Sequence, residues 1–248
     1  RHSVTKMSDL HFTSTSEYAQ RVIQMGEQPE RVFCVGALGI ENIKSIRLLS
    51  REQLCQKFGD IFLHNYIMVT YHPVTLEKHT AGIQFQKLLN VVENHPEYHY
   101  IFTYANADTD GAIINKMIES YTQEHKNTKA FVSMGQLGYL SALQYCSAVL
   151  GNSSSGIIEA PSFHIPTINI GDRQKGRVRA KTVIDCGYET RDIEQALTES
   201  QNQKFKDLCQ ESTNPYEGKN TSEQIIMQIK KYLNQVHGKQ KIFYDIEV

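Results

Sequence analysis

The sequence has no apolar run of about 18 residues, the length that a transmembrane helix needs. Its first residues, "RHSVTKMSD", are not followed by the apolar core of a signal peptide. Cysteine is scarce: there are five, an odd number, and none forms a CxxC pair, which disfavours a disulfide framework and a zinc site. These absences predict a cytoplasmic protein with reduced thiols and no membrane partner.

Two familiar nucleotide-binding motifs are also missing. There is no GxxxxGK[ST] and no GxGxxG, so nucleoside triphosphate hydrolysis and dinucleotide redox chemistry lose support. The 26 Lys and Arg residues nearly balance the 27 Asp and Glu residues and are spread along the chain, which disfavours a nucleic-acid partner. Nothing in the sequence requires a metal or a cofactor.

Short β-rich runs alternate with helical runs, which is the pattern of βαβ crossovers and a parallel sheet. The expected strands are 9–16, 31–36, 66–73, 99–106, 129–134, 148–152, 166–170 and 181–185. The expected helices are 16–26, 50–59, 76–94, 111–125, 138–146, 155–163, 190–200 and 221–236. Capping boxes are expected at Ser50–Gln53 and at Thr221–Gln224. The predicted fold class is therefore α/β with a Rossmann-like parallel sheet, and 37–65 reads as a connector between two units.

Polar residues follow the ends of the apolar strands. The strand at 66–73 ends in His72, the next ends in Asn106 and Asp108, and a third ends at Met134. "GNSSSGIIEAPS" (151–162) follows the fourth strand, and a loop with Arg173 follows the fifth. Taken singly, each of these signals is more typical of a turn or a solvated surface. Since ligands of open parallel sheets bind beyond the carboxyl ends of the strands, their clustering predicts a ligand site.

The residue types indicate the ligand. The hydroxyls of Ser153 and Ser154, at the start of an expected helix, suit phosphate oxygens, and Arg173 suits a second phosphate. Glu159 is able to accept hydrogen bonds from a vicinal diol such as that of ribose. His72 is placed to stabilise a leaving diphosphate, and the loop at Met134 offers backbone groups to a base edge. Together these features predict a site for a nucleoside diphosphate that carries another group.

Six segments resemble the hydrolysing UDP-N-acetylglucosamine 2-epimerases of sialic-acid and legionaminic-acid synthesis. In chain order they are "RHSVTKMSDLHF", "RVFCVGALGIENI", "HPVT", "GNSSSGIIEAP", "INIGDRQKGR" and "KIFYDI". The resemblance implies the C-terminal half of a GT-B architecture, built from two Rossmann-like domains. It also implies elimination of UDP from UDP-N-acetylglucosamine to give a 2-acetamidoglucal, which water converts to N-acetylmannosamine.

The same resemblance assigns roles to residues. Met134 would meet the uracil, Glu159 the ribose, and Ser153 and Ser154 the diphosphate. His72, Asn106 and Arg173 would complete the UDP site, with His72 and Arg173 as the catalytic pair. A related UDP-sugar, such as one carrying diacetamido-bacillosamine, stays open as the substrate.

The family pattern also implies domain limits. We expect 1–42 to be a remnant of the N-terminal Rossmann domain, 43–65 a connector and 66–218 the nucleotide-binding domain, with 219–248 packing back toward the N-terminal domain. The family's acid–base carboxylates have no counterpart here, so about 130 residues, one typical domain, are expected to precede the chain. The isolated chain is then expected to bind UDP weakly and not to turn over, and the full-length protein to be a homodimer.

Two other functions remain open from the sequence. One is a GT-B glycosyltransferase that uses the same UDP pocket, which would need an acceptor for turnover. The other is a non-catalytic nucleotide-sugar-binding module that works with a separate chain.

Overall fold

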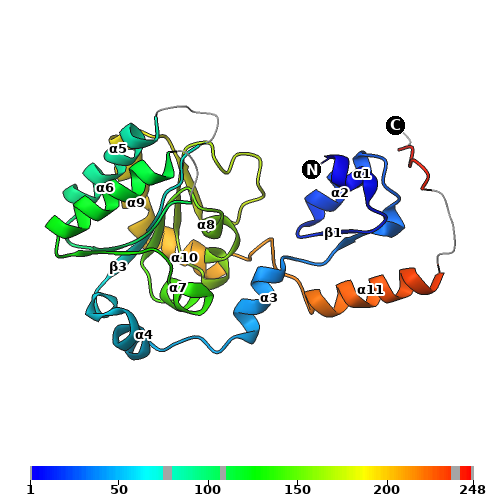
Figure 1. Cartoon of the computed structure of the whole chain (residues 1–248), viewed down its shortest axis with the longest axis horizontal. Helices are drawn as coiled ribbons and strands as arrows, with labels where there is room; N and C mark the ends of the chain where they lie inside the picture. Colours follow the sequence, from blue (N-terminus) through cyan, green and yellow to red (C-terminus); the bar gives the residue numbers. More distant parts are fainter. Residues whose placement is uncertain (1, 75–79, 107–109, 236–240, 247–248) are drawn as a thin grey trace. The chain divides into compact units, whose positions relative to one another are not determined.

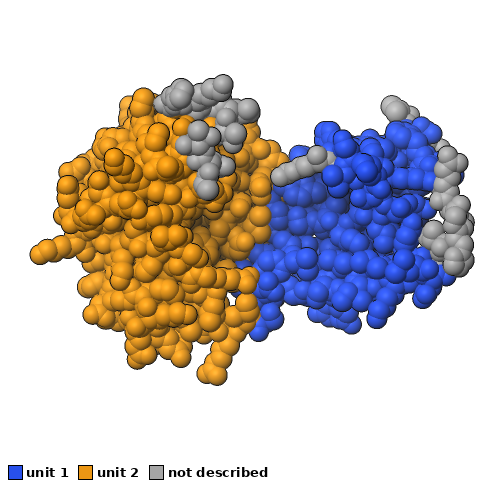
Figure 2. Space-filling model, viewed as in Figure 1, with its two compact units in different colours: residues 1–45, 215–248 blue, residues 46–214 orange. Residues whose placement is uncertain are grey.

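The computed structural model describes residues 2–74, 80–106, 110–235 and 241–246. The chain divides into two compact units (Figure 2). The smaller unit combines Arg1–Ser45 with Pro215–Val248, and the larger unit is Ile46–Asn214.

The larger unit is built on six parallel strands in the order β5-β4-β3-β6-β7-β8. All six were predicted from the sequence, although most are shorter than expected, and together they confirm the Rossmann-like parallel sheet. Their bounds are β3 Tyr66–Thr70, β4 His99–Thr103, β5 Thr128–Phe131, β6 Ala148–Gly151, β7 Thr167–Ile170 and β8 Val183–Cys186.

Helices cover both faces of this sheet (Figure 1). On one face lie α5 (Ala81–Asn94), α6 (Gly111–Glu124) and α9 (Thr190–Gln201), and on the other lie α7 (Gly135–Leu143) and α8 (Ser154–Ile158). The unit also contains α4 (Arg51–Phe58), α10 (Gln203–Glu211) and two 3-10 turns, η2 (Asp60–Leu63) and η3 (Ala160–Phe163). The range expected as a connector therefore contains helical structure.

The central strand β3 explains why the sheet is covered on both sides. All five of its residues are buried, as an apolar strand between two helix layers requires. Ile67 and Val69 pack in the core cluster formed with α5, α6 and α9. The alternate residue Tyr66 points to the opposite layer, where its hydroxyl donates to the carbonyl of Ala142 in α7 at 2.6 Å.

Several helix boundaries differ from the expectations. The capping box of α4 is confirmed, since Ser50 and Gln53 bond to each other's backbone N–H. The helix expected over 155–163 is instead the five-residue α8 followed by η3, because Pro161 lacks the N–H that a continuing α-helix needs. Helix α10 was not predicted. The first residues of the helix expected over 76–94, residues 76–79, lie outside the described residues. The observed helix α5 begins at Ala81.

The smaller unit contains two short parallel strands, β1 (His11–Thr13) and β2 (Val32–Cys34). Its helices are α1 (His2–Met7), α2 (Ser16–Gln24), η1 (Pro29–Arg31), α3 (Leu38–Ser45) and α11 (Thr221–Gln235). The capping box expected at Thr221 is wrong. Thr221 is the first residue of α11, and its buried hydroxyl donates to the carbonyl of Val35 at 2.7 Å. This bond ties the C-terminal helix to the end of β2.

A buried carboxylate joins both ends of the chain within this unit. Glu27 is 1% exposed, and its oxygens lie 2.8 Å from Lys6 Nζ, 2.8 Å from His11 Nε2 and 2.6 Å from Lys241 Nζ. Burial alone raises the pKa of Glu27, but the hydrogen bonds from Lys241, Lys6 and His11 outweigh it and hold the pKa at about 2. Lys241 also donates to the carbonyl of Ser8 at 2.6 Å, just beyond α1. The carboxylate therefore anchors the C-terminal segment 241–246.

We predict that Glu27→Gln lowers the free energy of unfolding by roughly 2–4 kcal/mol at pH 7, because it leaves two lysines beside a neutral amide. Since the folded pKa is depressed, this stabilisation is complete above the usual pKa and is lost as pH falls toward about 2. The difference between wild type and Glu27→Gln in urea unfolding, followed by circular dichroism, should therefore shrink between about pH 5 and pH 2.

The matched control is Glu17→Gln, which removes a carboxylate from the exposed ion pair with Arg21 in α2. Its effect should stay below about 0.5 kcal/mol at every pH. A constant difference between wild type and Glu27→Gln across this pH range would contradict the role given to the buried carboxylate.

Candidate functional site

The register of the sheet brings the ends of its central strands to one level. Thr70 of β3 pairs with Thr103 of β4 and with Gly151 of β6, and Thr103 pairs in turn with Phe131 of β5. Because all these strands are parallel, the residues that follow them emerge at the same edge of the sheet. This edge is where the sequence predicts a ligand site.

Close approach of β3 and β6 sets the geometry of this edge. Gly151 has φ +135°, and a Cβ placed on it would lie 2.0 Å from the carbonyl oxygen of Thr70. Only glycine fits such an approach. The next residue, Asn152, is fully buried, and its N–H donates to the same Thr70 carbonyl at 3.1 Å.

The side chain of Asn152 then continues the ladder beyond the last strand residues. Its Oδ1 accepts the backbone N–H of His72 at 2.7 Å, and its Nδ2 donates to the backbone carbonyl of His72 at 2.8 Å. The backbone carbonyl of Asn152 accepts hydrogen bonds from Arg173 Nη1 at 3.0 Å and from Gln174 Nε2 at 2.7 Å. One buried asparagine therefore links the ends of β3, β6 and β7.

The imidazole of His72 is held by a second bond. The N–H of Asn106 donates to His72 Nδ1 at 3.2 Å, so Nδ1 is an acceptor and the tautomer with hydrogen on Nε2 follows. The side chain is 7% exposed. His72 thus presents an N–H donor from a fixed ring.

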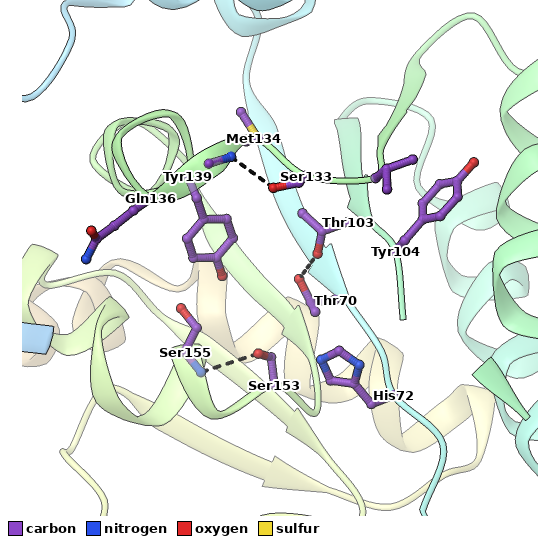
Figure 3. A pocket seen from close by; sticks show the side chains of 12 residues that line it. Thr70, His72, Thr103, Tyr104, Ser133, Met134, Gln136, Tyr139, Ser153 and Ser155 are labelled. Atoms are coloured by element: carbon purple, nitrogen blue, oxygen red, sulfur yellow. Dashed lines mark hydrogen bonds between the residues drawn. The ribbon is translucent and has the colours of Figure 1, made fainter. Parts of the chain in front are cut away.

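A cavity of about 360 Å³ lies at this edge (Figure 3). Its volume lies within the range of small-molecule sites. Among the described residues that line it there is no Asp, Glu, Lys or Arg. Most of its accessible surface is apolar, although seven of the lining residues carry a hydroxyl group. The lining residues are Thr70, His72, Thr103, Tyr104, Val132, Ser133, Met134, Gly135, Gln136, Tyr139, Ser153 and Ser155.

The cavity brings together three of the seven site residues expected from the sequence: His72, Met134 and Ser153. Asn106 reaches it through the bond to His72, and Arg173 is linked to His72 by two successive hydrogen-bonded contacts through Asn152. The other two, Ser154 and Glu159, belong to the same α8 segment but do not line the cavity. Asp108, which the sequence placed at one of these strand ends, lies outside the described residues.

The helix that follows the serine loop is shorter than the short helix expected over 155–163. Ser153 is the N-cap of α8, and its hydroxyl accepts the N–H of Ser155 at 3.3 Å. Since α8 has only five residues, any anion bound here depends on hydroxyl and histidine donors more than on a helix dipole.

Glu159 closes α8 and is half-buried. Burial raises the pKa of its carboxyl, and this effect exceeds the opposing influence of the Ser155 hydroxyl, of its own backbone and of Arg177. Hydrogen-bond donors from a ligand would therefore stabilise the ionised form of Glu159, which burial disfavours.

Sequence reasoning missed several lining residues. Tyr139 sits inside a helix that reads as core, and Thr70 and Thr103 end otherwise apolar strands. A polar residue at the last position of a buried strand was the available signal for the two threonines. For Tyr139 no local signal exists, since only the packing of α7 beside α8 brings it to the cavity.

We predict that Asn152→Asp lowers the free energy of unfolding by about 1–3 kcal/mol at pH 7, because a carboxylate has no hydrogen to donate to the His72 carbonyl. Burial of the new carboxyl raises its pKa, and its protonated form regains a donor. The loss should therefore diminish as pH is lowered, when each variant is compared with wild type at the same pH by urea denaturation.

Asn90→Asp is the matched control, since Asn90 is exposed on α5 and its Oδ1 only accepts from Gln86. Its effect should stay below about 0.5 kcal/mol. Equal effects of the two substitutions would contradict the role of Asn152 as a clamp.

None of the helices in the described ranges is long and apolar enough to span a membrane. Those same ranges contain no group of three or more His, Cys, Asp or Glu side chains placed to hold a metal ion.

The fold and sequence both match known proteins. The chain is 42% identical to the polysialic acid biosynthesis protein P7 of Escherichia coli over 99% of its own length and 63% of that protein's length. It is 39% identical to the hydrolysing GDP/UDP-N,N'-diacetylbacillosamine 2-epimerase of Campylobacter jejuni, over 83% of this chain and 53% of the relative. The chain therefore spans just over half to about two thirds of the length of these relatives.

A solved structure of S. aureus MnaA with UDP superposes with a TM-score of 0.75 at 21% identity, over 97% of this chain and 65% of that one. This likeness confirms the predicted fold, the Rossmann-like portion of a GT-B architecture. The family model described as UDP-N-acetylglucosamine 2-epimerase matches residues 1–230. The chain therefore belongs to the UDP-N-acetylglucosamine 2-epimerase family.

Proposed function

We propose that the chain is the UDP-binding part of a hydrolysing UDP-N-acetylglucosamine 2-epimerase, which converts UDP-N-acetylglucosamine to N-acetylmannosamine and UDP. The family match over residues 1–230 is the observation that carries this proposal. The 42% identity to a polysialic acid biosynthesis protein and the 39% identity to a hydrolysing 2-epimerase support it. The second of these relatives is named for a diacetylbacillosamine nucleotide as its substrate. The proposal therefore includes two substrates, UDP-N-acetylglucosamine and a UDP-sugar with the diacetamido substitution of that relative's substrate.

In this proposal His72 stabilises the departing diphosphate. Its Nδ1 accepts the Asn106 N–H, so the Nε2 N–H is the donor that we propose binds a phosphate oxygen. Elimination removes the proton from carbon 2, forms a double bond between carbons 1 and 2, and breaks the bond between the anomeric carbon and the UDP oxygen, so charge builds up on that oxygen. The two hydrogen bonds from the Asn152 side chain hold the His72 backbone in place. The His72 donor therefore stabilises this charge without first having to reorganise.

The other residues follow the same logic. Ser153 and Ser154 are proposed to bind the diphosphate, and Arg173 adds positive charge beside the Asn152 carbonyl. Glu159 is proposed to accept the ribose hydroxyls, which supply donors to a carboxylate that burial disfavours. Met134, at the start of α7, is proposed to face the uracil.

The proposal extends to domain roles. Residues 66–218 would bind the nucleotide, 43–65 would connect the two parts, and 1–42 with 219–248 would belong with the N-terminal Rossmann domain. We propose that the acid–base carboxylates lie in the part of the relatives' length that this chain does not span. The resemblance also supports a homodimer, and five unpaired cysteines support a reducing cytoplasmic location.

The glycosyltransferase and the non-catalytic module gain no support. The relatives described above carry epimerase or polysialic acid biosynthesis names rather than transferase names. Hydrolysis without an acceptor remains the discriminating chemistry.

We predict that the chain of residues 1–248 binds UDP with a dissociation constant on the order of 0.1–1 mM, because one domain supplies only part of a two-domain site. His72→Asn keeps an acceptor for the Asn106 N–H but loses the donor at the Nε2 position. It should weaken UDP binding about tenfold in a ligand-observed NMR titration, which is the size of one charge-assisted hydrogen bond.

His72→Gln places an amide N–H near the position of Nε2 and should lose less affinity than His72→Asn. His64→Asn is the control, because His64 stacks on His99 and does not line the cavity. Unchanged UDP affinity in His72→Asn would remove His72 from the proposed site.

We also predict that residues 1–248 alone bind UDP without releasing N-acetylmannosamine from UDP-N-acetylglucosamine. The reason is the proposed absence of the acid–base carboxylates from this part of the enzyme. Product would be detected by chromatography after incubation with and without acceptor sugars. Full turnover by these residues alone would contradict the proposed division of labour, and turnover only with an acceptor would favour a transferase.

A further inference from the structure

The cavity contains two buried hydroxyls that the proposed function does not use. The oxygen atoms of Tyr139 and Ser155 are buried, and neither has a hydrogen-bond partner within the described residues. Both residues line the cavity, and the Tyr139 hydroxyl points from α7 toward Ser155 at the start of α8 (Figure 3). The Tyr139 hydroxyl has only weak contacts with the hydroxyls of Ser155 and Thr70, and none of them reaches full hydrogen-bond geometry.

Unsatisfied buried hydroxyls are uncommon, because each costs about 1–3 kcal/mol relative to a bonded one. Two of them facing one cavity from different helices indicate a site in which a ligand supplies the missing partners. Burial raises the pKa of Tyr139 strongly, so its hydroxyl keeps its proton. It is therefore a hydrogen-bond donor at any physiological pH.

Neighbouring hydroxyls leave these two donors available. Thr70 and Thr103 bond to each other across β3 and β4, and Ser153 accepts the Ser155 N–H. The Ser155 hydroxyl also lies beside the carboxyl of Glu159 and lowers its pKa, although this contact does not reach full hydrogen-bond geometry. The described residues that line the cavity include no charged side chain, and their hydroxyl groups suit a ligand group that only accepts hydrogen bonds. The non-bridging oxygens of a phosphate have that chemistry.

The placement of the two hydroxyls suggests which phosphate. Tyr139 and Ser155 lie between the Met134–Gln136 rim and the pair formed by Ser153 and His72 (Figure 3). In the proposed function the Met134–Gln136 rim binds the uracil, and His72 binds the end of the diphosphate that carries the sugar. The part of the ligand between these two positions is the ribose with its attached phosphate.

We infer that Tyr139 and Ser155 are paired hydroxyl donors to the phosphate adjacent to the ribose of a bound nucleoside diphosphate. This inference rests on the proposed function and adds two ligand-binding residues to it. Each hydroxyl that loses its phosphate oxygen would return to the unsatisfied state seen here, so both contribute to affinity for phosphorylated ligands only.

The test compares UDP, UMP and uridine by ligand-observed NMR titration against wild type, Tyr139→Phe, Ser155→Ala and the double variant. Each single substitution should weaken UDP and UMP about fivefold to tenfold, the effect of one hydrogen bond. Uridine affinity should change less than about twofold, since uridine has no phosphate. The double variant should lose less than the product of the single losses, because both donors serve one phosphate.

Tyr104→Phe is the matched control. Tyr104 lines the same cavity, but its hydroxyl already donates to Glu119 at 2.8 Å and turns away from the other labelled residues (Figure 3). It should leave all three affinities unchanged.

The outcomes separate the two proposals. Wild type that fails to bind UDP would overturn the proposed function together with this inference. Wild type that binds UDP, with unchanged UDP affinity in Tyr139→Phe and Ser155→Ala, would overturn the donor pair alone. Equal losses for UDP and uridine would also overturn it, since they would assign the hydroxyls to the nucleoside or to positioning Glu159.

Discussion

The side chain of Asn152 is the contact on which the site depends. A parallel sheet delivers several loops to one edge, but nothing in the ladder fixes the backbone once the strands end. Asn152 extends the pairing of β3 and β6 by one more residue with its amide, which copies the donor and acceptor of a backbone peptide. Its carbonyl then receives Arg173 and Gln174 from the loop after β7. The position of His72 is thereby set by sheet geometry rather than by a loop alone.

This arrangement explains why the surrounding sequence is small and polar. Gly151 allows the backbones of β3 and β6 to approach, which places Asn152 within reach of His72. Gly156 has a similar role one turn later, since a Cβ there would lie 2.6 Å from Thr167 Cγ2 of β7. Of the three serines between these glycines, Ser153 and Ser155 line the cavity. In the run "GNSSSG", the glycines therefore allow close packing of the strands, and the serines supply hydroxyl groups.

The sequence was most informative where a feature depends on local pattern. Continuous apolar runs predicted the six strands of the larger unit, and parallel pairing followed from the helices between most of them. Ser50 and Gln53 predicted a cap that depends only on neighbouring residues. The same pattern at Thr221 failed because the hydroxyl found a distant acceptor, Val35, whose position no local rule specifies. Tyr139 was missed for the same reason, since its hydroxyl reaches the cavity only through tertiary packing.

The most direct test of the account is a crystal structure of the chain with UDP bound. The account predicts a diphosphate oxygen within hydrogen-bonding distance of His72 Nε2, with Asn106 still donating to Nδ1 and Asn152 still bonded to the His72 backbone. Density for UDP away from the edge formed by β3, β4 and β6 would contradict it. So would a bound diphosphate whose oxygens make no contact with His72 or Ser153.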